Sequence, residues 1–313
     1  MVKQILSCDW GTTSFRLRLI NVADGKVMAE NVAGKGISIV YNEWLQSGLA
    51  EKERINFYKN ILQSHIERLI PKSFVEEVPI IISGMASSTI GITELPYGDI
   101  PFAISKNTLP VKRIMPDKKC KHEILLVSGL KTNNDVMRGE ETMLLGNNFT
   151  DEEALFIFPG THSKHVIVKD KVFVDFKTYM TGEVFNLLAN KSILSNSVEK
   201  NTADQNNSIF ETAVKQASSG NLLNMGFHVR TNQLFKKYTA AENYYYLSGL
   251  VIGTELKDIV TGNYNIQLVC SRELAEPYLL ALKILIPNST VKYSDADEAL
   301  ITGHCKLAKD LLK

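Results

Sequence analysis

The sequence predicts an α/β protein built from two similar domains, and three observations lead to this fold class. The chain has 313 residues, roughly the length of two average domains. A meander of three predicted strands occurs near residue 4 and again near residue 154, each time with a Gly-Thr turn between its first two strands. Strand–helix alternation follows each copy. We therefore expect an N-terminal domain over 1–148 and a C-terminal domain over 149–313, whose last helix is free to pack back on the first.

The first half opens with a predicted antiparallel meander. Residues 4–8 are a short apolar run, and the stretch after Phe15 alternates apolar side chains with arginines, which is the period of a strand. Asp24-Gly25 marks the turn into a third strand. The remaining expected elements of this half are a helix over 51–70 that Pro71 ends and buried strands over 78–85 and 123–130.

The second half repeats the pattern. A second meander is predicted from Ala154, with turns at Pro159-Gly160 and Lys169-Asp170. Gly249 and Gly253 share one helical face, so we expect another helix to cross closely there. The other expected elements are helices near 182–195, 207–218 and 241–261, a strand over 266–270, a helix over 272–285, a strand near 290–292 and a terminal helix from about 295.

Composition excludes several classes of protein. The formal net charge is +1, from 35 basic and 34 acidic residues, which argues against a general nucleic-acid binder. The four cysteines are widely spaced and form no zinc motif. The N-terminal residues lack the apolar stretch of a signal peptide, and no apolar run is long enough to cross a bilayer. We expect a cytoplasmic protein without membrane or nucleic-acid partners; the oligomeric state stays open, a dimer included.

Each Gly-Thr turn is a candidate phosphate-binding loop. In the first, Gly11 allows a close backbone approach, and Thr12, Thr13 and Ser14 offer hydroxyls and N–H groups to phosphate oxygens. Asp9, at the end of the preceding strand, is suited to hold Mg²⁺ through water. A plain hairpin with a glycine explains this turn equally well.

The second turn contains the equivalent residues. Gly160, Thr161 and Ser163 are the candidate phosphate contacts, and Lys164 adds a positive charge. His162 and His165 are three residues apart, so on a strand they point to opposite faces and do not share a metal ion. Two such turns facing each other would form a phosphate clamp.

Asp135 is the candidate general base. It is expected at a strand-to-helix junction, where a carboxylate could accept the proton of a substrate hydroxyl. A helix N-cap is the alternative, and from the residues alone it is favoured. Arg138 lies three residues later, about one helical turn on, and is a candidate partner for a substrate carboxylate, with a helix-surface salt bridge as the alternative. Arg16 is a further candidate, although the alternation of its strand would also let it face solvent.

Six segments together resemble the 2-dehydro-3-deoxygalactonokinase family of the sugar kinase/actin/heat-shock ATPase superfamily. They occur in order along nearly the whole chain, and the segments around Asp135 and Gly160 are the most specific. These segments are CDWGTTSFR, SGMASSTIG with ELPYGDIPF, NDVMRGEETMLLG, FPGTHSKHV, FKTYMTGEVFNLL and LSGLVIGTEL.

The resemblance implies two ribonuclease-H-like (actin-like ATPase) domains with ATP in the cleft between them. It implies transfer of the γ-phosphoryl group of MgATP to the 6-hydroxyl of 2-dehydro-3-deoxy-D-galactonate, with the sugar acid on the first domain and the adenine on the second. By analogy, Asp9–Ser14 is the first phosphate loop, and Gly160, Thr161, His162 and Ser163 form the second. Asn134-Asp135 matches the Asn-Asp pair of hexokinase-like relatives, which shifts the interpretation of Asp135 from helix cap to catalytic base.

The chain departs from the family pattern at three positions. Ser87 stands where the family usually has Gly in a sugar-facing turn, and Ile92 stands where it usually has Trp, so the sugar acid itself is open. Ser271 replaces a Gly in the expected adenine-side turn, which leaves the nucleotide preference open. The alternatives to this kinase are a kinase for a related sugar acid, a phosphohydrolase and a nucleotide-driven clamp of the same superfamily.

Overall fold

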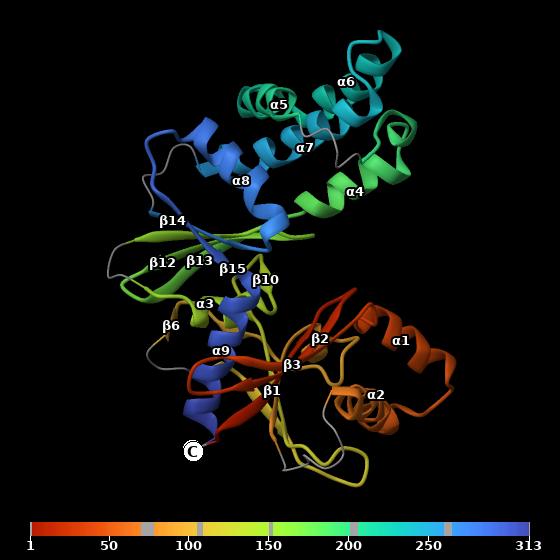
Figure 1. Cartoon of the computed structure of the whole chain (residues 1–313), viewed down its shortest axis with the longest axis vertical. Helices are drawn as coiled ribbons and strands as arrows, with labels where there is room; N and C mark the ends of the chain where they lie inside the picture. The colour runs from red at the N-terminus through yellow and green to blue at the C-terminus, as the bar shows by residue number, and fades with distance from the viewer. Residues whose placement is uncertain are drawn as a thin grey trace. The chain divides into compact units, whose positions relative to one another are not determined.

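The computed structural model describes residues 2–69, 78–104, 109–149, 153–200, 206–259 and 265–312. The chain divides into two compact units (Figure 1). The first contains residues 1–150, 171–174 and 296–313, and the second contains residues 151–170 and 175–295. The expected domain boundary, between residues 148 and 149, lies two residues before the division between residues 150 and 151. The terminal helix is part of the first unit. The expected stop at Pro71 lies outside the described residues.

A six-stranded sheet forms the centre of the first unit. Its strand order is β3-β2-β1-β4-β8-β7. β1 pairs antiparallel with β2 and parallel with β4, and β4 continues parallel to β8. This is the expected meander followed by parallel strands, the arrangement of a ribonuclease-H-like domain. The strands are β1 (Gln4–Trp10), β2 (Phe15–Asn21), β3 (Val27–Ala33), β4 (Ile80–Gly84), β7 (Val111–Ile114) and β8 (Ile124–Val127).

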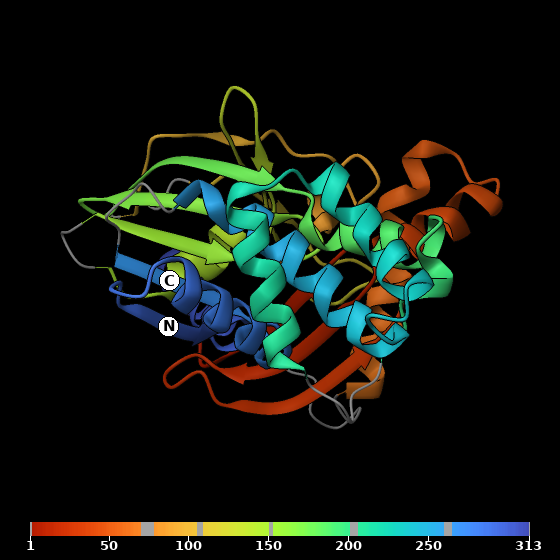
Figure 2. The ribbon, with the colours of Figure 1, turned by 90° about the horizontal axis from the view of Figure 1, so that it is seen from above.

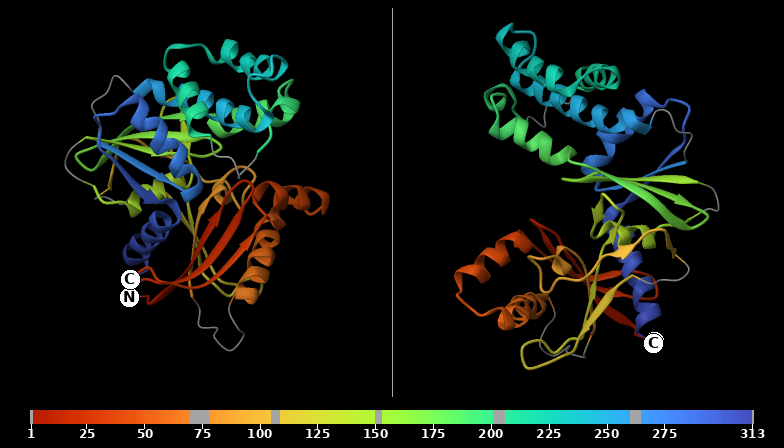
Figure 3. Two further views of the ribbon diagram at one scale, coloured as in Figure 1. Left: turned by 45° about the horizontal axis from the view of Figure 1, so that its top comes forward. Right: turned by 180° about the vertical axis from the view of Figure 1, so that it is seen from behind.

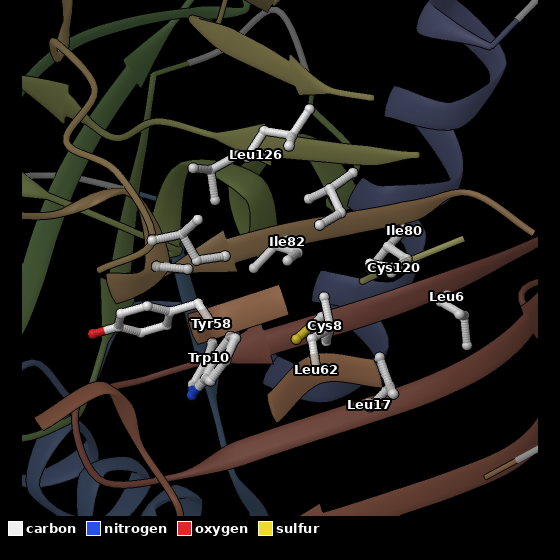
Figure 4. Close-up of a cluster of buried hydrophobic side chains, with 14 of the residues drawn as sticks. Leu6, Cys8, Trp10, Leu17, Tyr58, Leu62, Ile80, Ile82, Cys120 and Leu126 are labelled. Atoms are coloured by element: carbon white, nitrogen blue, oxygen red, sulfur yellow. The ribbon is translucent and has the colours of Figure 1, made fainter. Parts of the chain in front are cut away.

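The two faces of this sheet carry different helices (Figures 1 and 3). On one face α1 (Ile37–Gln46) and α2 (Arg54–Leu69, after the short η1, Glu51–Glu53) cover alternate strand residues such as Leu6, Cys8 and Trp10 (Figure 4). On the other face lies α9 (Ala296–Leu311), which packs against β1 and α3 (Glu140–Gly146). The odd-numbered residues of β1, Ser7 and Asp9 among them, therefore point to the α9 side.

Short elements complete the first unit. Leu130–Lys131 (β9) pairs antiparallel with Val136–Met137 (β10) and parallel with Gly98–Asp99 (β5). Phe102–Ala103 (β6) pairs with the first residues of β13 (Val172–Tyr179), and Met85–Ser87 (η3) continues from β4. The β9–β10 hairpin was not expected, because two-residue strands show no periodicity.

The second large sheet has the strand order β15-β14-β11-β12-β13-β6. From β13 to β15 it repeats the order of the first sheet from β3 to β8. β11 pairs antiparallel with β12 and parallel with β14, and β14 is parallel to β15. The predicted internal repeat is thus confirmed at the level of strand order. The strands not yet given are β11 (Ala154–Phe158), β12 (Ser163–Lys169), β14 (Asn265–Cys270) and β15 (Val291–Asp295).

A layer of helices covers one face of the second sheet (Figures 1 and 2). At the crossing of α7 with α5, a Cβ on Gly249 would meet the carbonyl oxygen of Phe210 at 2.5 Å and one on Gly253 would meet the Ala217 Cβ at 2.9 Å, so the expected close crossing is confirmed. The layer contains α4 (Thr181–Lys191), η5 (Ser195–Ser197), α5 (Asn207–Ser219), α6 (Leu222–Leu234), α7 (Ala240–Leu256), η6 (Lys257–Ile259) and α8 (Arg272–Leu285). Within the described ranges, no helix has the length and apolarity needed to span a bilayer.

Candidate active site

The first Gly-Thr turn joins β1 to β2, and its residues Thr12, Thr13 and Ser14 are exposed. The Gly11 N–H donates to the Ser14 carbonyl (3.0 Å), which closes the turn. Among the described residues, the N–H groups of Thr12 and Thr13 have no protein acceptor. Backbone N–H groups without acceptors can bind an anion, so this turn has donors available for phosphate, and its role as a phosphate loop stays a prediction.

Helix α1 braces this turn from behind. The N–H groups of Ile37 and Ser38 donate to the carbonyls of Gly11 (2.9 Å) and Thr12 (3.1 Å). The approach is close, because a Cβ on Gly36 would lie 2.4 Å from the Thr12 carbonyl oxygen. The turn carbonyls thus face the helix, which leaves the turn N–H groups pointing elsewhere.

The second Gly-Thr turn joins β11 to β12 and is braced in the same way. The N–H groups of Gly182 and Glu183, at the start of α4, donate to the carbonyls of Gly160 (3.2 Å) and Thr161 (3.0 Å). A Cβ on Gly182 would lie 2.6 Å from the Gly160 carbonyl oxygen. The N–H groups of Thr161 and His162 lack a protein acceptor among the described residues. The repeat therefore extends from the turns to the helices that hold them.

The side chains of the second turn take up different positions. Thr161 and His162 are exposed, and His162 Nε2 lies 2.5 Å from a carboxylate oxygen of Glu183. Ser163 is fully buried beneath the turn, where its hydroxyl accepts from the Gly160 N–H (3.4 Å). Lys164 is also buried, and its Nζ donates to the His162 carbonyl (2.8 Å). Ser163 and Lys164 thus contact the turn from below.

Asp9 points to the α9 side of the first sheet, directly before the first turn. It is partly buried, and its Cα partner on β2 is Arg16. Burial raises the pKa of Asp9 to about 6; the positive charges of Arg16 and Arg18 oppose the rise, and the negative charges of Asp297 and Glu140 add to it. A carboxylate that is costly to ionise in the free protein gains from a nearby cation, which fits a Mg²⁺ site.

The alternation of its strand allowed Arg16 to face solvent, but in the structure its side chain is paired. Helix α9 lies on that side, and Arg16 Nη1 donates to Asp297 Oδ1 at 2.7 Å. Arg18 binds the other oxygen of Asp297 (2.7 Å) and also Glu30 (2.6 Å). Arg16 is still partly exposed, but its charge is paired within the first unit, which makes it a weaker candidate for a substrate carboxylate than Arg138.

Asp135 lies in the turn of the β9–β10 hairpin, not at a helix start. Its N–H donates to Thr132 Oγ1 (2.8 Å), and its carbonyl accepts from the Thr132 N–H (2.9 Å). Helix α3 begins only at Glu140, and its N-cap is Gly139. The N-cap explanation of Asp135 is therefore wrong, and so is the expectation that Arg138 lies one helical turn beyond it. Both errors come from the unpredicted strand β10.

The side chain of Arg138 contacts neutral groups, whereas its backbone N–H donates to a carboxylate oxygen of Glu140 (3.0 Å). Its guanidinium donates to the hydroxyls of Tyr97 (3.0 Å) and Ser87 (2.7 Å), and it lies 4.0 Å from the centre of the Tyr97 ring. It also contacts Ser128 Oγ (3.4 Å) and the Leu95 carbonyl (3.3 Å). Within the described ranges, no carboxylate forms an ion pair with it, so the helix-surface salt bridge is absent. A partly exposed, unneutralised guanidinium suits an anionic ligand.

The three departures from the family pattern lie in different environments. Ser87 is fully buried and holds Arg138, and Ile92 is buried in the core of the first unit. Ser271 is the exposed N-cap of α8, with no side-chain cap bond. Three residues of the site were not predicted from the sequence: Gly36, Gly182 and Tyr97. A glycine directly before or within the first turn of a helix in both halves was a signal for the first two.

Comparison with known proteins identifies the family. The 2-keto-3-deoxy-galactonokinase family model matches residues 9–307. A probable 2-dehydro-3-deoxygalactonokinase of Rhizobium meliloti (strain 1021) is 34% identical over 307 residues, covering 94% of this chain and 93% of the relative. The 2-dehydro-3-deoxygalactonokinase of Escherichia coli (strain K12) is 29% identical over 219 residues, covering 67% and 72%.

A solved structure agrees with these relatives. The crystal structure assigned provisionally to a 2-dehydro-3-deoxygalactonokinase of Sinorhizobium meliloti superposes with a TM-score of 0.81 at 32% identity, and the match covers 98% of this chain and 99% of that one. The strand order, the paired turns and the near-complete coverage thus lead to the same result. The chain belongs to the 2-keto-3-deoxy-galactonokinase family.

Proposed function

We propose that this protein is an ATP-dependent kinase that phosphorylates the 6-hydroxyl of 2-dehydro-3-deoxy-D-galactonate. The observation that carries the proposal is the pair of braced Gly-Thr turns, each with two exposed residues whose N–H groups find no acceptor among the described residues. Family membership supplies the substrate, because the relatives named above are 2-dehydro-3-deoxygalactonokinases. The proposed cofactors are ATP and Mg²⁺.

The first and second turns bind phosphate oxygens of ATP in this proposal. Backbone N–H groups of Thr12, Thr13, Thr161 and His162 supply the donors, and Lys164 adds positive potential beneath the second turn. Asp9 would hold Mg²⁺ through water, and the charge of the ion would stabilise this partly buried carboxylate and offset charge on the phosphates. Ser271, at the exposed N-terminus of α8, is assigned to the adenine side.

The sugar acid binds near Asp135 and Arg138. Asp135 accepts the proton of the 6-hydroxyl while the oxygen of that hydroxyl attacks the γ-phosphorus of ATP. The bond between the γ-phosphorus and the bridging β–γ oxygen breaks, and ADP is released. Arg138, held by Ser87 and Tyr97, faces the carboxylate of the sugar acid, since an unpaired carboxylate in a closed site is costly.

A kinase for a related sugar acid is the second candidate. The observation that favours it is Ser87, whose hydroxyl takes one guanidinium N–H of Arg138 and so changes what that side chain offers to a substrate. A coupled assay of ADP formation over a panel of 2-keto-3-deoxy sugar acids separates the two. Highest kcat/KM with 2-dehydro-3-deoxy-D-galactonate supports the first candidate, and a clear preference for another acid of the panel supports the second.

A further inference from the structure

Glu255 is a buried carboxylate in the second unit that the proposed mechanism does not use. It lies near the end of α7, and its side chain is 1% exposed. Three groups from three other elements contact it. His165 Nε2 of β12 lies 2.8 Å from Oε1, Tyr278 of α8 donates to Oε2 (2.6 Å), and Thr181 of α4 donates to the same oxygen. A buried carboxyl group is costly without hydrogen-bond partners, so these three contacts fix both the side chain and the groups around it.

Two of these partners connect Glu255 to the second Gly-Thr turn. The Tyr278 hydroxyl also lies 3.2 Å from the Ser163 hydroxyl, and that hydroxyl accepts from the Gly160 N–H (3.4 Å). A continuous buried chain of hydrogen bonds therefore runs from Glu255 to the glycine of the turn.

The other connection passes through the start of α4. Thr181, bound to Glu255, directly precedes Gly182 and Glu183, whose N–H groups hold the carbonyls of Gly160 and Thr161. Glu255 thus contacts the turn by two routes, from beneath through Tyr278 and from the side through Thr181. Groups of this kind keep donors fixed where a ligand needs them.

We propose that Glu255 is a positioning residue for nucleotide binding, acting through Tyr278 and Thr181 to keep the N–H groups of the second turn aimed at phosphate. This inference rests on the proposed function for the identity of the ligand. It differs from a purely packing role in one respect: each route leaves Glu255 through a hydroxyl group, so removing that hydroxyl while keeping the shape of the side chain should disturb the turn.

Tyr278→Phe is the matched test, because it deletes only the hydroxyl. Its control is Tyr246→Phe, also on a buried tyrosine (3% against 2% exposed) of the same unit, whose hydroxyl donates to Gln216 Oε1 at 2.7 Å. Thr181→Val, which keeps the shape of the side chain, cuts the second route. Affinity for MgATP and MgADP is measured by calorimetry without sugar, along with KM for each substrate and the thermal midpoint.

Tyr278→Phe and Thr181→Val should each weaken nucleotide affinity by roughly three- to tenfold, the effect of one lost hydrogen bond. KM for the sugar acid should stay within about twofold, and Tyr246→Phe should leave nucleotide affinity unchanged. Unchanged nucleotide affinity in both Tyr278→Phe and Thr181→Val would overturn the inference, as would an equal loss in Tyr246→Phe. A wild-type protein that binds nucleotide but phosphorylates no sugar acid would overturn the proposed function instead.

Discussion

At the scale of single residues, Asp135 and Arg138 lie on one short segment, the β10 side of a hairpin that leads into α3. Their roles differ in a way that substitutions separate. A base acts in the transition state, whereas a carboxylate partner acts on substrate binding. The two residues should therefore change different kinetic constants.

Asp135→Asn keeps the size of the side chain and removes the proton acceptor. The backbone hydrogen bonds with Thr132 do not depend on the carboxylate, so the hairpin should persist. We expect kcat to fall by roughly 10²–10⁴-fold with nucleotide affinity retained. Steady-state kinetics together with calorimetric nucleotide binding check this, and near-normal turnover would remove Asp135 from the chemistry.

Arg138→Lys keeps the charge but loses the planar fork and the contacts with Tyr97 and Ser87. KM for the sugar acid should rise about tenfold, corresponding to about 1.4 kcal/mol, while KM for ATP changes little. Initial-rate kinetics with each substrate varied in turn give both constants. A rise in KM for ATP with an unchanged sugar KM would contradict the carboxylate role.

Asp9→Asn should raise stability and lower activity together. Because the folded-state pKa of about 6 exceeds the unfolded value of 3.8, the folded state disfavours the charged carboxylate, and wild-type stability falls as pH rises between these values. Asparagine has no charge to bury, so the thermal midpoint of the variant should exceed that of wild type at about pH 8 and by less at about pH 5. Affinity for MgATP should fall far more than affinity for the sugar acid. A variant less stable than wild type at both pH values would assign Asp9 a structural role.

At the scale of elements, the meanders and most helices were predictable, because alternation and helical spacing are visible in each. Helix α1 carries the same signal in Ile37, Val40 and Trp44 but was not predicted. Helix α6 was not predicted either. It buries Gly226 and Asn232 beside Met225 and Val229, so its inner face has little apolar periodicity. The predicted position of Asp135 was wrong for a related reason, because β9 and β10 are too short to show a pattern in the sequence.

Close helix crossing gives a stability prediction at this scale. Gly249→Ala would place its Cβ 2.5 Å from the Phe210 carbonyl oxygen and 2.8 Å from the Ala213 Cβ, so α5 and α7 must separate. The free energy of unfolding should fall by about 1–3 kcal/mol. Gly226→Ala, on α6 with no atom within 4 Å of the added Cβ, is the control and should gain about 0.5–1 kcal/mol. Urea denaturation measures both, and equal effects would contradict the crossing.

At the scale of the whole molecule, the chain contains an internal structural repeat. Each unit has a meander, a Gly-Thr turn and a helix whose first N–H groups hold that turn from behind. The turns themselves were predictable from WGTTS and PGTHS, but the bracing was not, because hydrogen bonds between Ile37 and Gly11 join positions far apart in sequence. The buried connection of Glu255 to the second turn could not be predicted from the sequence for the same reason.

The reaction products show whether the protein transfers the γ-phosphoryl group of ATP to the 6-hydroxyl of 2-dehydro-3-deoxy-D-galactonate. The protein is incubated with MgATP and the sugar acid, ADP and inorganic phosphate are quantified, and phosphorus–proton NMR coupling locates the new phosphate ester. We expect ADP in an amount equal to a product phosphorylated at the 6-oxygen, and little ADP when the sugar acid is omitted. Equal ADP formation without the sugar acid, with release of inorganic phosphate, would exclude the proposed kinase activity and identify the protein as a hydrolase or a nucleotide-driven clamp.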